Sequence, residues 1–126
     1  MNDRISGGIS LPKAVDGFHT LAGKWELNTE EAAQVMKLSE REYKSLLMHS
    51  YEGEVADEAI IERVRMLISI HRALNLMSPS GAFLKFFKQP YPREPLNGLS
   101  IRQYLLIHSD DASLGRLYRW ANSLVV

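Results

Sequence analysis

The side chains best suited to acid–base or metal chemistry in this chain are four histidines and one pair of aspartates. The histidines are widely spaced, so no two stand four residues apart, as metal ligands on one helix face would. Asp110 and Asp111 are adjacent, and adjacent carboxylates before a helix typically cap it and complement its dipole. The chain has no cysteine, which excludes a thiolate nucleophile, a thiolate metal site and disulfides. We therefore predict no catalytic residue, no metal site and no cofactor, and interpret the protein as a non-enzyme. The histidines are His19, His49, His71 and His108.

A rigid segment from Gln89 to Gly98 indicates binding rather than catalysis. Its three prolines each remove an amide donor and fix a φ angle, so the segment is ordered in advance and loses little entropy when a partner docks. Tyrosine, tryptophan and arginine, the residue types that dominate protein interfaces, gather around it. The alternative is a structural corner, and we favour core packing for Phe86, Phe87 and Trp120. The residues we expect to bind a partner protein are Tyr91, Arg93, Arg102, Arg116, Arg119 and Val126.

A second candidate binding unit lies between Thr29 and Ser50. Two short helical patterns joined by a tight turn at Lys37 outline a helix-turn-helix, whose second helix would enter a DNA major groove. Residues 26–50 carry three bases against five acids, and the two acids in the first turn of the second helix would repel phosphate. We favour a packing unit and keep DNA contact as the alternative. The residues expected to contact DNA in that case are Ser39, Arg41 and Lys44.

Helices must position both candidate sites. The strongest periodic pattern is a long helix from Asp57, whose apolar stripe includes Ile68 and His71, and we interpret His71 as a hydrogen-bonded core residue. Other helices are predicted from capping patterns and apolar spacing, and no segment alternates as a strand would. The sequence thus predicts an all-α fold of about seven helices. Their expected starts are Leu11, Asn28, Ser39, Asp57, a short apolar helix through Phe83, Ser100, and Asp110 or Asp111.

The polar, glycine-containing break from Tyr51 to Glu54 is the expected domain boundary. We predict a helix-turn-helix-like N-terminal domain over residues 1–55 and a helical binding domain over residues 56–126. In the last helix, the residues expected to share one face are Leu114, Leu117, Tyr118, Ala121 and Leu124.

Composition is that of a globular protein without a strongly charged surface. The formal net charge is zero, which is atypical of a DNA-binding domain. The charge is unevenly distributed, because residues 1–77 carry nine bases and twelve acids (9 − 12 = −3) and residues 78–126 carry six and three (6 − 3 = +3). No apolar run is long enough to span a membrane and no signal peptide is recognisable, so we expect a cytoplasmic protein.

The stretch "ERVRMLISIHRALNLMSPSGAFLKFFKQPYPREPLNGLSIRQYLL" resembles the C-terminal toxin-binding domain of the Xre/MbcA/ParS family of bacterial antitoxins. Glu62-Arg63 matches the opening of the family's long helix, and Phe86-Phe87 stands for its aromatic pair. Pro90-Tyr91, Asn97-Gly98 and Ser100-Ile101 stand for the loop and helix start that follow. The stretch "EEAAQVMKLSEREYKSLL" is similar to the degenerate helix-turn-helix of these antitoxins, so the resemblance covers about residues 18–124.

The resemblance implies the antitoxin of a type II toxin–antitoxin system. Its partner would be a cognate RES-type toxin that consumes or transfers from NAD, neutralised when the C-terminal domain covers the toxin's active site. The resemblance also implies a homodimer formed through the N-terminal part, and repression of the protein's own operon through operator DNA. The alternative is a DNA-binding transcriptional regulator without a toxin partner.

Overall fold

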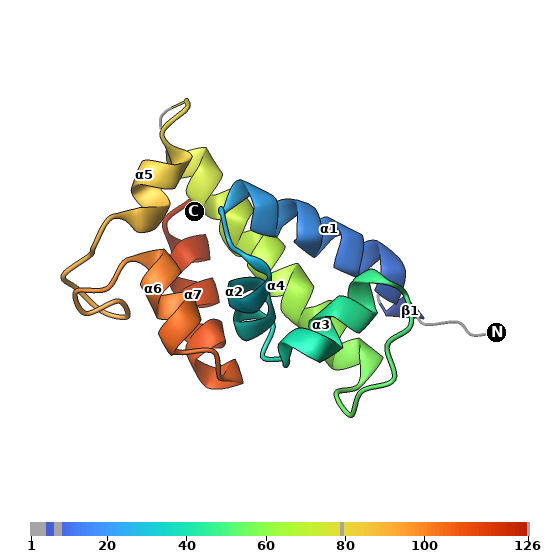
Figure 1. Ribbon diagram of the computed structural model, residues 1–126. Coiled ribbons are helices and arrows are strands. Elements are labelled where there is room, and N and C mark those ends of the chain that lie inside the picture. Colours follow the sequence, from blue (N-terminus) through green and yellow to red (C-terminus); the bar gives the residue numbers. More distant parts are fainter. Residues whose placement is uncertain (1–4, 7–8, 79, 126) are drawn as a thin grey trace. The chain divides into compact units, whose positions relative to one another are not determined.

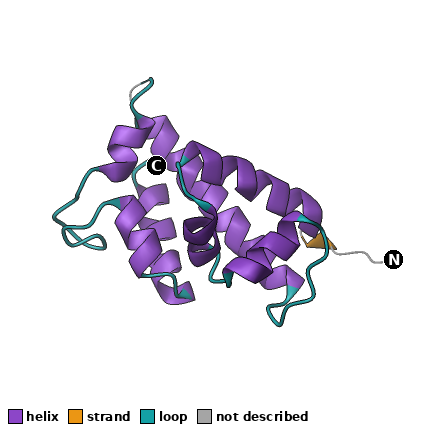
Figure 2. Ribbon diagram, viewed as in Figure 1, coloured by secondary structure: helices purple, strands orange, loops and turns teal. Residues whose placement is uncertain are grey.

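The computed structural model describes residues 5–6, 9–78 and 80–125, and within them the chain is mainly helical (Figures 1 and 2). The predicted all-α fold is confirmed, with seven helices in the described part of the chain. No helix among these residues combines the length and the apolar composition needed to cross a membrane. The helices are α1 (Leu11–Lys24), α2 (Thr29–Val35), α3 (Glu40–Leu47), α4 (Asp57–Met77), α5 (Phe83–Lys88), α6 (Ile101–Ile107) and α7 (Asp111–Ser123).

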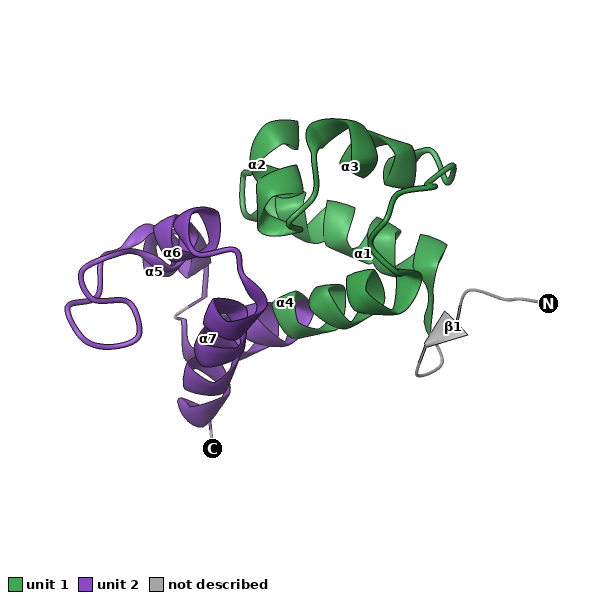
Figure 3. Ribbon diagram, turned by 90° about the horizontal axis from the view of Figure 1, so that it is seen from below, with its two compact units in different colours: residues 1–67 green, residues 68–126 purple. Residues whose placement is uncertain are grey.

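The chain divides into two compact units, residues 1–67 and residues 68–126 (Figure 3). The division falls inside α4, which contributes its first half to unit 1 and its second half to unit 2. The break at Tyr51–Glu54 is a loop, as expected, but the compact units are not divided there. The reason lies in α4 itself, since Ile60, Ile61 and Val64 are buried in the first half of this helix. The assignment of residues 1–55 and 56–126 to two functional domains stays a prediction.

In unit 1, α3 packs against α1 and α2 around large aromatic side chains. Trp25 and Phe18 are buried, and the Phe18 and Tyr43 rings meet edge to face with their centroids 5.9 Å apart. Two of the predicted starts are confirmed as capping boxes, at Asn28 and at Ser39. These caps satisfy backbone amides that a helix start otherwise leaves unpaired.

Each of the first three helices ends in a left-handed residue that is not glycine. Glu26, Lys37 and His49 follow the caps of α1, α2 and α3 with φ values of 57°, 62° and 56°. After α2, the amides of Lys37 and Leu38 donate to the carbonyls of Gln34 and Ala33 at 3.0 and 2.9 Å, which satisfies carbonyls at the helix end. The tight turn expected at Lys37 is therefore formed, in a conformation that costs a side-chain-bearing residue about 1 kcal/mol or more.

The buried stripe of α4 differs from the expected one in its second half. Ile70 and Ala73 are buried, whereas Ile68 and His71 are only half-buried. The expected core role of His71 is therefore wrong, and its ring instead packs edge to face on Phe83, with centroids 4.7 Å apart. The stripe changes because the second half of α4 belongs to unit 2 and packs on a different set of helices.

Two short strands precede α1, although no strand was predicted. The strand β1 (Ile5–Ser6) pairs antiparallel with β2 (Ile9–Ser10), with Ile5 opposite Ser10 and Ser6 opposite Ile9. Strands of two residues are too short to display the alternation that predicts a strand. Ser10 then caps α1 by accepting from the amide of Lys13 at 3.3 Å.

Unit 2 is tied together by contacts from α7 to its neighbours. The hydroxyl of Tyr104 in α6 donates to the carbonyl of Ser113 in α7 at 2.8 Å. The hydroxyl of Ser69 in α4 donates to the side-chain oxygen of Asn122 at 3.2 Å. Ser100 and Gln103 form the predicted capping box of α6, and the last helix is capped by Asp110.

Candidate functional site

The segment between α5 and α6 is a closed loop that runs out from the helices of unit 2 (Figures 1 and 2). At its base Pro90 pairs with Ser100 in an isolated β-bridge. Above the bridge, the amide of Tyr91 donates to the carbonyl of Leu99 at 3.1 Å, and the amide of Gly98 donates to the carbonyl of Tyr91 at 2.6 Å. These cross-loop bonds hold the two arms of the loop together.

The tip of the loop is also internally bonded. The amides of Leu96 and Asn97 both donate to the carbonyl of Arg93, at 3.0 and 2.9 Å. Asn97 and Gly98 then take positive φ values of 48° and 97°, which turn the chain back toward α6. Leu96 is 1% exposed and anchors the tip, whereas most other side chains of the loop are exposed.

Tyr91 links the loop to two helices of unit 2. Its hydroxyl donates to the carbonyl of Phe86 at 3.2 Å, and its ring lies 6.1 Å from the ring of Phe86, centroid to centroid. On its other side the ring of Trp120 in α7 approaches to 5.7 Å at an angle of 72°. Burial raises the pKa of the Tyr91 phenol above its ordinary value.

A mainly apolar hollow of about 330 Å³ opens beside these rings, and we call it the apolar hollow. Apolar and aromatic residues at the ends of α4, α5 and α7 form one part of it, and the loop forms the other. It has the composition of a site for an apolar side chain, since only two charged residues line it. The lining residues are Met77, Phe86, Tyr91, Pro92, Arg93, Glu94, Trp120 and Leu124.

The aromatic residues near the loop are therefore not all core. Phe87 is fully buried, as expected, but Phe86 and Trp120 are half-buried and line the apolar hollow. Leu124, expected on the apolar face of α7, is 40% exposed. Helical spacing alone did not separate these residues from the core, because it defines a face and not what covers that face.

A second hollow, of about 400 Å³, lies beside the same loop, and we call it the polar hollow. Side chains from the loop, α6 and α7 line it, and most of them carry hydrogen-bonding groups. Glu94 lines both hollows, so the tip of the loop separates the two. The residues that line the polar hollow are Glu94, Pro95, Asn97, Tyr104, His108, Ser113, Arg116 and Arg119.

The first turns of α7 arrange the charged groups at the polar hollow. Nη2 of Arg116 donates to the hydroxyl of Ser113 at 3.0 Å. The hydroxyl and the backbone amide of Ser113 hold the pKa of Asp110 below its ordinary value, and the positive charge of Arg116 contributes in the same direction. A Cβ built on Gly115 would lie 3.4 Å from Nη1 of Arg119, so this guanidinium lies close over the glycine.

The structure brings together four of the six residues expected to bind a partner. Tyr91 and Arg93 line the apolar hollow, and Arg116 and Arg119 line the polar hollow. Arg102 is half-buried in α6 and lines neither hollow. The sixth residue, Val126, lies outside the described residues. Their role in binding a partner protein stays a prediction.

The three residues expected to contact DNA lie at the N-cap of α3 and along this helix, and two of them are engaged within the unit. The hydroxyl of Ser39 accepts from the amide of Glu42 at 3.1 Å as the helix cap. Nζ of Lys44 lies 3.1 Å from a carboxylate oxygen of Glu40. Arg41 is exposed. A DNA contact through Lys44 would have to break or share this surface ion pair.

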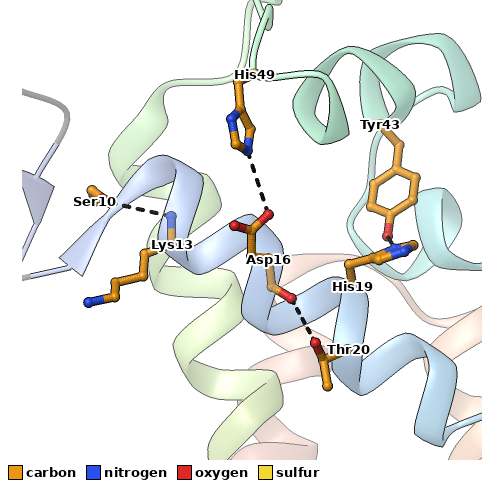
Figure 4. A network of polar contacts seen from close by, with 7 residues as sticks. All are labelled: Ser10, Lys13, Asp16, His19, Thr20, Tyr43 and His49. Carbon is orange, nitrogen blue, oxygen red and sulfur yellow. Dashed lines mark hydrogen bonds and ion pairs between the residues drawn. The ribbon is translucent and has the colours of Figure 1, made fainter.

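Two histidines of unit 1 each form a polar contact. One contact joins α1 to α3, and the other joins α1 to the residues just after α3 (Figure 4). Nε2 of His49 lies 3.5 Å from Oδ1 of Asp16, and Nδ1 of His19 lies 3.5 Å from the hydroxyl of Tyr43. Burial raises the pKa of Tyr43 to about 12. Within the described residues, no three His, Asp or Glu side chains are grouped to hold a metal ion.

Comparison of the chain with models of protein families, with curated proteins and with solved structures finds no match in any of the three.

Proposed function

We propose that the protein is the antitoxin of a type II toxin–antitoxin pair. In this proposal it neutralises a cognate RES-type toxin that consumes NAD, by placing the loop between α5 and α6 over the toxin's active site. The protein performs no reaction itself and acts by occlusion. It requires no cofactor, because inhibition needs only a surface that fits the entrance of the toxin's pocket.

The observation that carries the proposal is a preformed loop beside a half-open aromatic hollow. The loop is internally bonded, so little entropy is lost when a partner orders it. Tyr91 and Trp120 present ring surface in the hollow, and Arg93 adds an exposed guanidinium at its border. Interfaces take most of their binding energy from tyrosine, tryptophan and arginine side chains in such settings.

The charge of unit 2 supports the same proposal. Residues 68–126 carry seven bases and three acids (7 − 3 = +4). The floor of a pocket that binds the phosphates of NAD is itself positive, so the exposed arginines of the covering surface suit acidic side chains around the rim of that pocket. Arg93, Arg116 and Arg119 are the exposed arginines of the two hollows.

The test is co-expression with the product of the neighbouring gene. We expect that product to be toxic alone, to be tolerated with this protein, and to co-purify with it. The triple variant Arg93→Glu/Arg116→Glu/Arg119→Glu should weaken the complex at least about tenfold and abolish protection. A matched variant, Lys13→Glu/Arg72→Glu/Lys85→Glu, reverses three exposed charges elsewhere and should retain both.

Equal losses in the two triple variants would assign the effect to net charge and would contradict a specific role for the loop surface. A neighbouring product that is harmless, or that does not bind, would contradict the antitoxin proposal. Sedimentation of the protein alone tests the accompanying proposal of a homodimer formed through the N-terminal part.

The alternative function is a DNA-binding transcriptional regulator. The observation that favours it is the succession of α2, a tight turn and α3, with Arg41 exposed on α3. A gel-shift titration with the protein's own promoter tests it across a series of salt concentrations. Specific binding that falls with salt and is weakened by Arg41→Ala favours DNA binding, and the absence of binding at low salt contradicts it.

A further inference from the structure

We propose that the polar hollow is a binding site for an oxyanion group, a carboxylate or a phosphate, held between Arg116 and Arg119. The two arginines stand three residues apart on α7 and therefore share one face of the helix. Both guanidiniums are exposed and both line the same hollow of about 400 Å³. Guanidinium groups bind carboxylate and phosphate oxygens through paired hydrogen bonds.

One of the two guanidiniums is held in place before any ligand arrives. Ser113 is 3% exposed, and its hydroxyl accepts from Nη2 of Arg116 at 3.0 Å. An arginine has further N–H donors, so this contact orients the group and leaves donors for a ligand. Because a buried serine fixes the contact, Arg116 loses less side-chain freedom on binding than an unsupported arginine would.

The second guanidinium, that of Arg119, lies over Gly115, the residue that precedes Arg116. Nη1 of Arg119 would lie only 3.4 Å from a Cβ on Gly115, so the side chain lies back along α7 over that residue. Two like charges on neighbouring positions of a helix repel each other. Within the described residues neither guanidinium forms an ion pair, so an anion between them would relieve the repulsion.

Other charged and polar groups limit which anion fits. Glu94 lines the hollow from the loop and opposes an anion, and Asp110 acts on Arg116 electrostatically from the helix cap. Asn97 and His108 line the remaining wall and offer additional hydrogen-bonding groups. Two guanidiniums and one carboxylate line the hollow, so its lining is net positive, and Asp110 reduces that charge from outside the lining. Such a lining suits a single compact anionic group.

The experiment follows backbone amide chemical shifts of the isolated protein during titration with inorganic phosphate and, separately, with glutarate. Phosphate represents the phosphate of a small molecule, and glutarate represents an acidic side chain of a partner protein. Sodium chloride at equal ionic strength supplies the baseline. We expect saturable shifts at the amides of Asn97, Gly115 and Arg116 with at least one of the two anions. The anion that binds with the higher affinity identifies the kind of molecule that carries the natural ligand group.

Three variants make the measurement specific. Arg116→Gln and Arg119→Gln should each weaken binding about tenfold, the value of a charge-assisted hydrogen bond. Arg72→Gln/Lys85→Gln removes two exposed charges of unit 2 outside the hollow and should leave the affinity nearly unchanged. Glu94→Gln should tighten binding about two- to fivefold, because it removes the opposing carboxylate.

Shifts that do not saturate with either anion, or that persist in both arginine variants, would overturn the proposal. An unchanged or weaker affinity in Glu94→Gln would also count against it. The inference does not rest on the antitoxin proposal, because the isolated protein is measured and no partner is needed. If the neighbouring gene product is harmless, the antitoxin proposal fails but anion binding is unaffected. If neither anion binds, the anion site fails but toxin binding is unaffected.

Discussion

The rings of Tyr91 and Trp120 lie 5.7 Å apart and meet at 72°, which ties the loop between α5 and α6 to the last helix of unit 2. Edge-to-face pairs of this kind contribute about 0.5–1.5 kcal/mol beyond their buried area. Because Tyr91 also donates to the carbonyl of Phe86, one side chain positions the loop against two helices. The apolar hollow is the open space that remains beside this contact.

The two tryptophans should respond differently to a fluorescence quencher. Trp25 is 0% exposed in unit 1, whereas Trp120 is half-buried at the apolar hollow. In the Trp25→Phe variant the remaining emission should be quenched by acrylamide, and in the Trp120→Phe variant it should be largely protected. Circular dichroism checks that both variants fold. Equal quenching of the two single-tryptophan proteins would contradict the exposure of Trp120. If a bound partner protects Trp120 from acrylamide, that partner lies at the apolar hollow.

Arg63 should be a stability residue. It is 7% exposed, and its Nε donates to the carbonyl of Val35 at the end of α2 at 2.8 Å. Arg63→Ala should lower the free energy of unfolding by about 2–3 kcal/mol, because a charge-assisted hydrogen bond is lost and a helix-end carbonyl loses its donor. Urea unfolding measures the change.

Arg65 provides the matched control for Arg63. It is partly exposed on the same helix, and its surface contact with Glu62 is 3.9 Å long. Arg65→Ala should cost less than about 1 kcal/mol, the usual limit for such pairs. Similar losses in both variants would contradict a special role for the buried arginine.

Glycine at position 37 should stabilise the protein. Lys37 has a φ of 62°, a conformation that glycine adopts without steric cost. Lys37→Gly should raise the free energy of unfolding by about 0.5–1 kcal/mol after the greater chain entropy of glycine is included. Lys44→Gly, inside α3, should instead lower it by about 1 kcal/mol. Thermal unfolding compares the two, and a loss of stability in both would refute the strain argument.

Stability should decline at high pH through the phenol of Tyr43. Burial raises its pKa to about 12 in the folded protein, against 10.0 for an ordinary tyrosine. The folded state therefore keeps this proton where the unfolded chain releases it. The resulting stabilisation is complete below about pH 10, is lost as the pH rises to about 12, and amounts to on the order of 2 kcal/mol.

The comparison with Tyr43→Phe isolates this effect. The variant lacks the titrating group, so its free energy of unfolding should fall less between about pH 10 and 12 than that of the natural protein. Leu76→Ala, at an exposed position without a titrating group, serves as the control and should keep the natural pH dependence. Identical pH profiles for the natural protein and Tyr43→Phe would contradict the prediction.

Helix starts were predictable because their signals are local. The caps at Ser39 and Ser100 each pair with a side chain three residues later, so the pattern is complete within one turn. The buried stripe of α4 was predictable in its first half and at Leu74, but not at Ile68 and His71. In the second half of the helix the packing partners change, and Ile70 takes the buried position expected for Ile68.

The candidate site was predictable in residue type but not in arrangement. Proline, tyrosine and arginine around the loop indicated a binding surface, and Tyr91, Arg93, Arg116 and Arg119 do line hollows beside it. The half-buried positions of Phe86 and Trp120 were not predictable, because whether an aromatic ring is covered depends on residues distant in the chain.

By itself, then, the sequence determined the all-α class, the helix starts and the position of the rigid loop, because caps, periodicity and proline act within a few residues. Only the tertiary structure decided which side chains surround the two hollows. The contact of Tyr91 with Trp120 joins positions far apart in the chain, and such contacts form only when the helices pack.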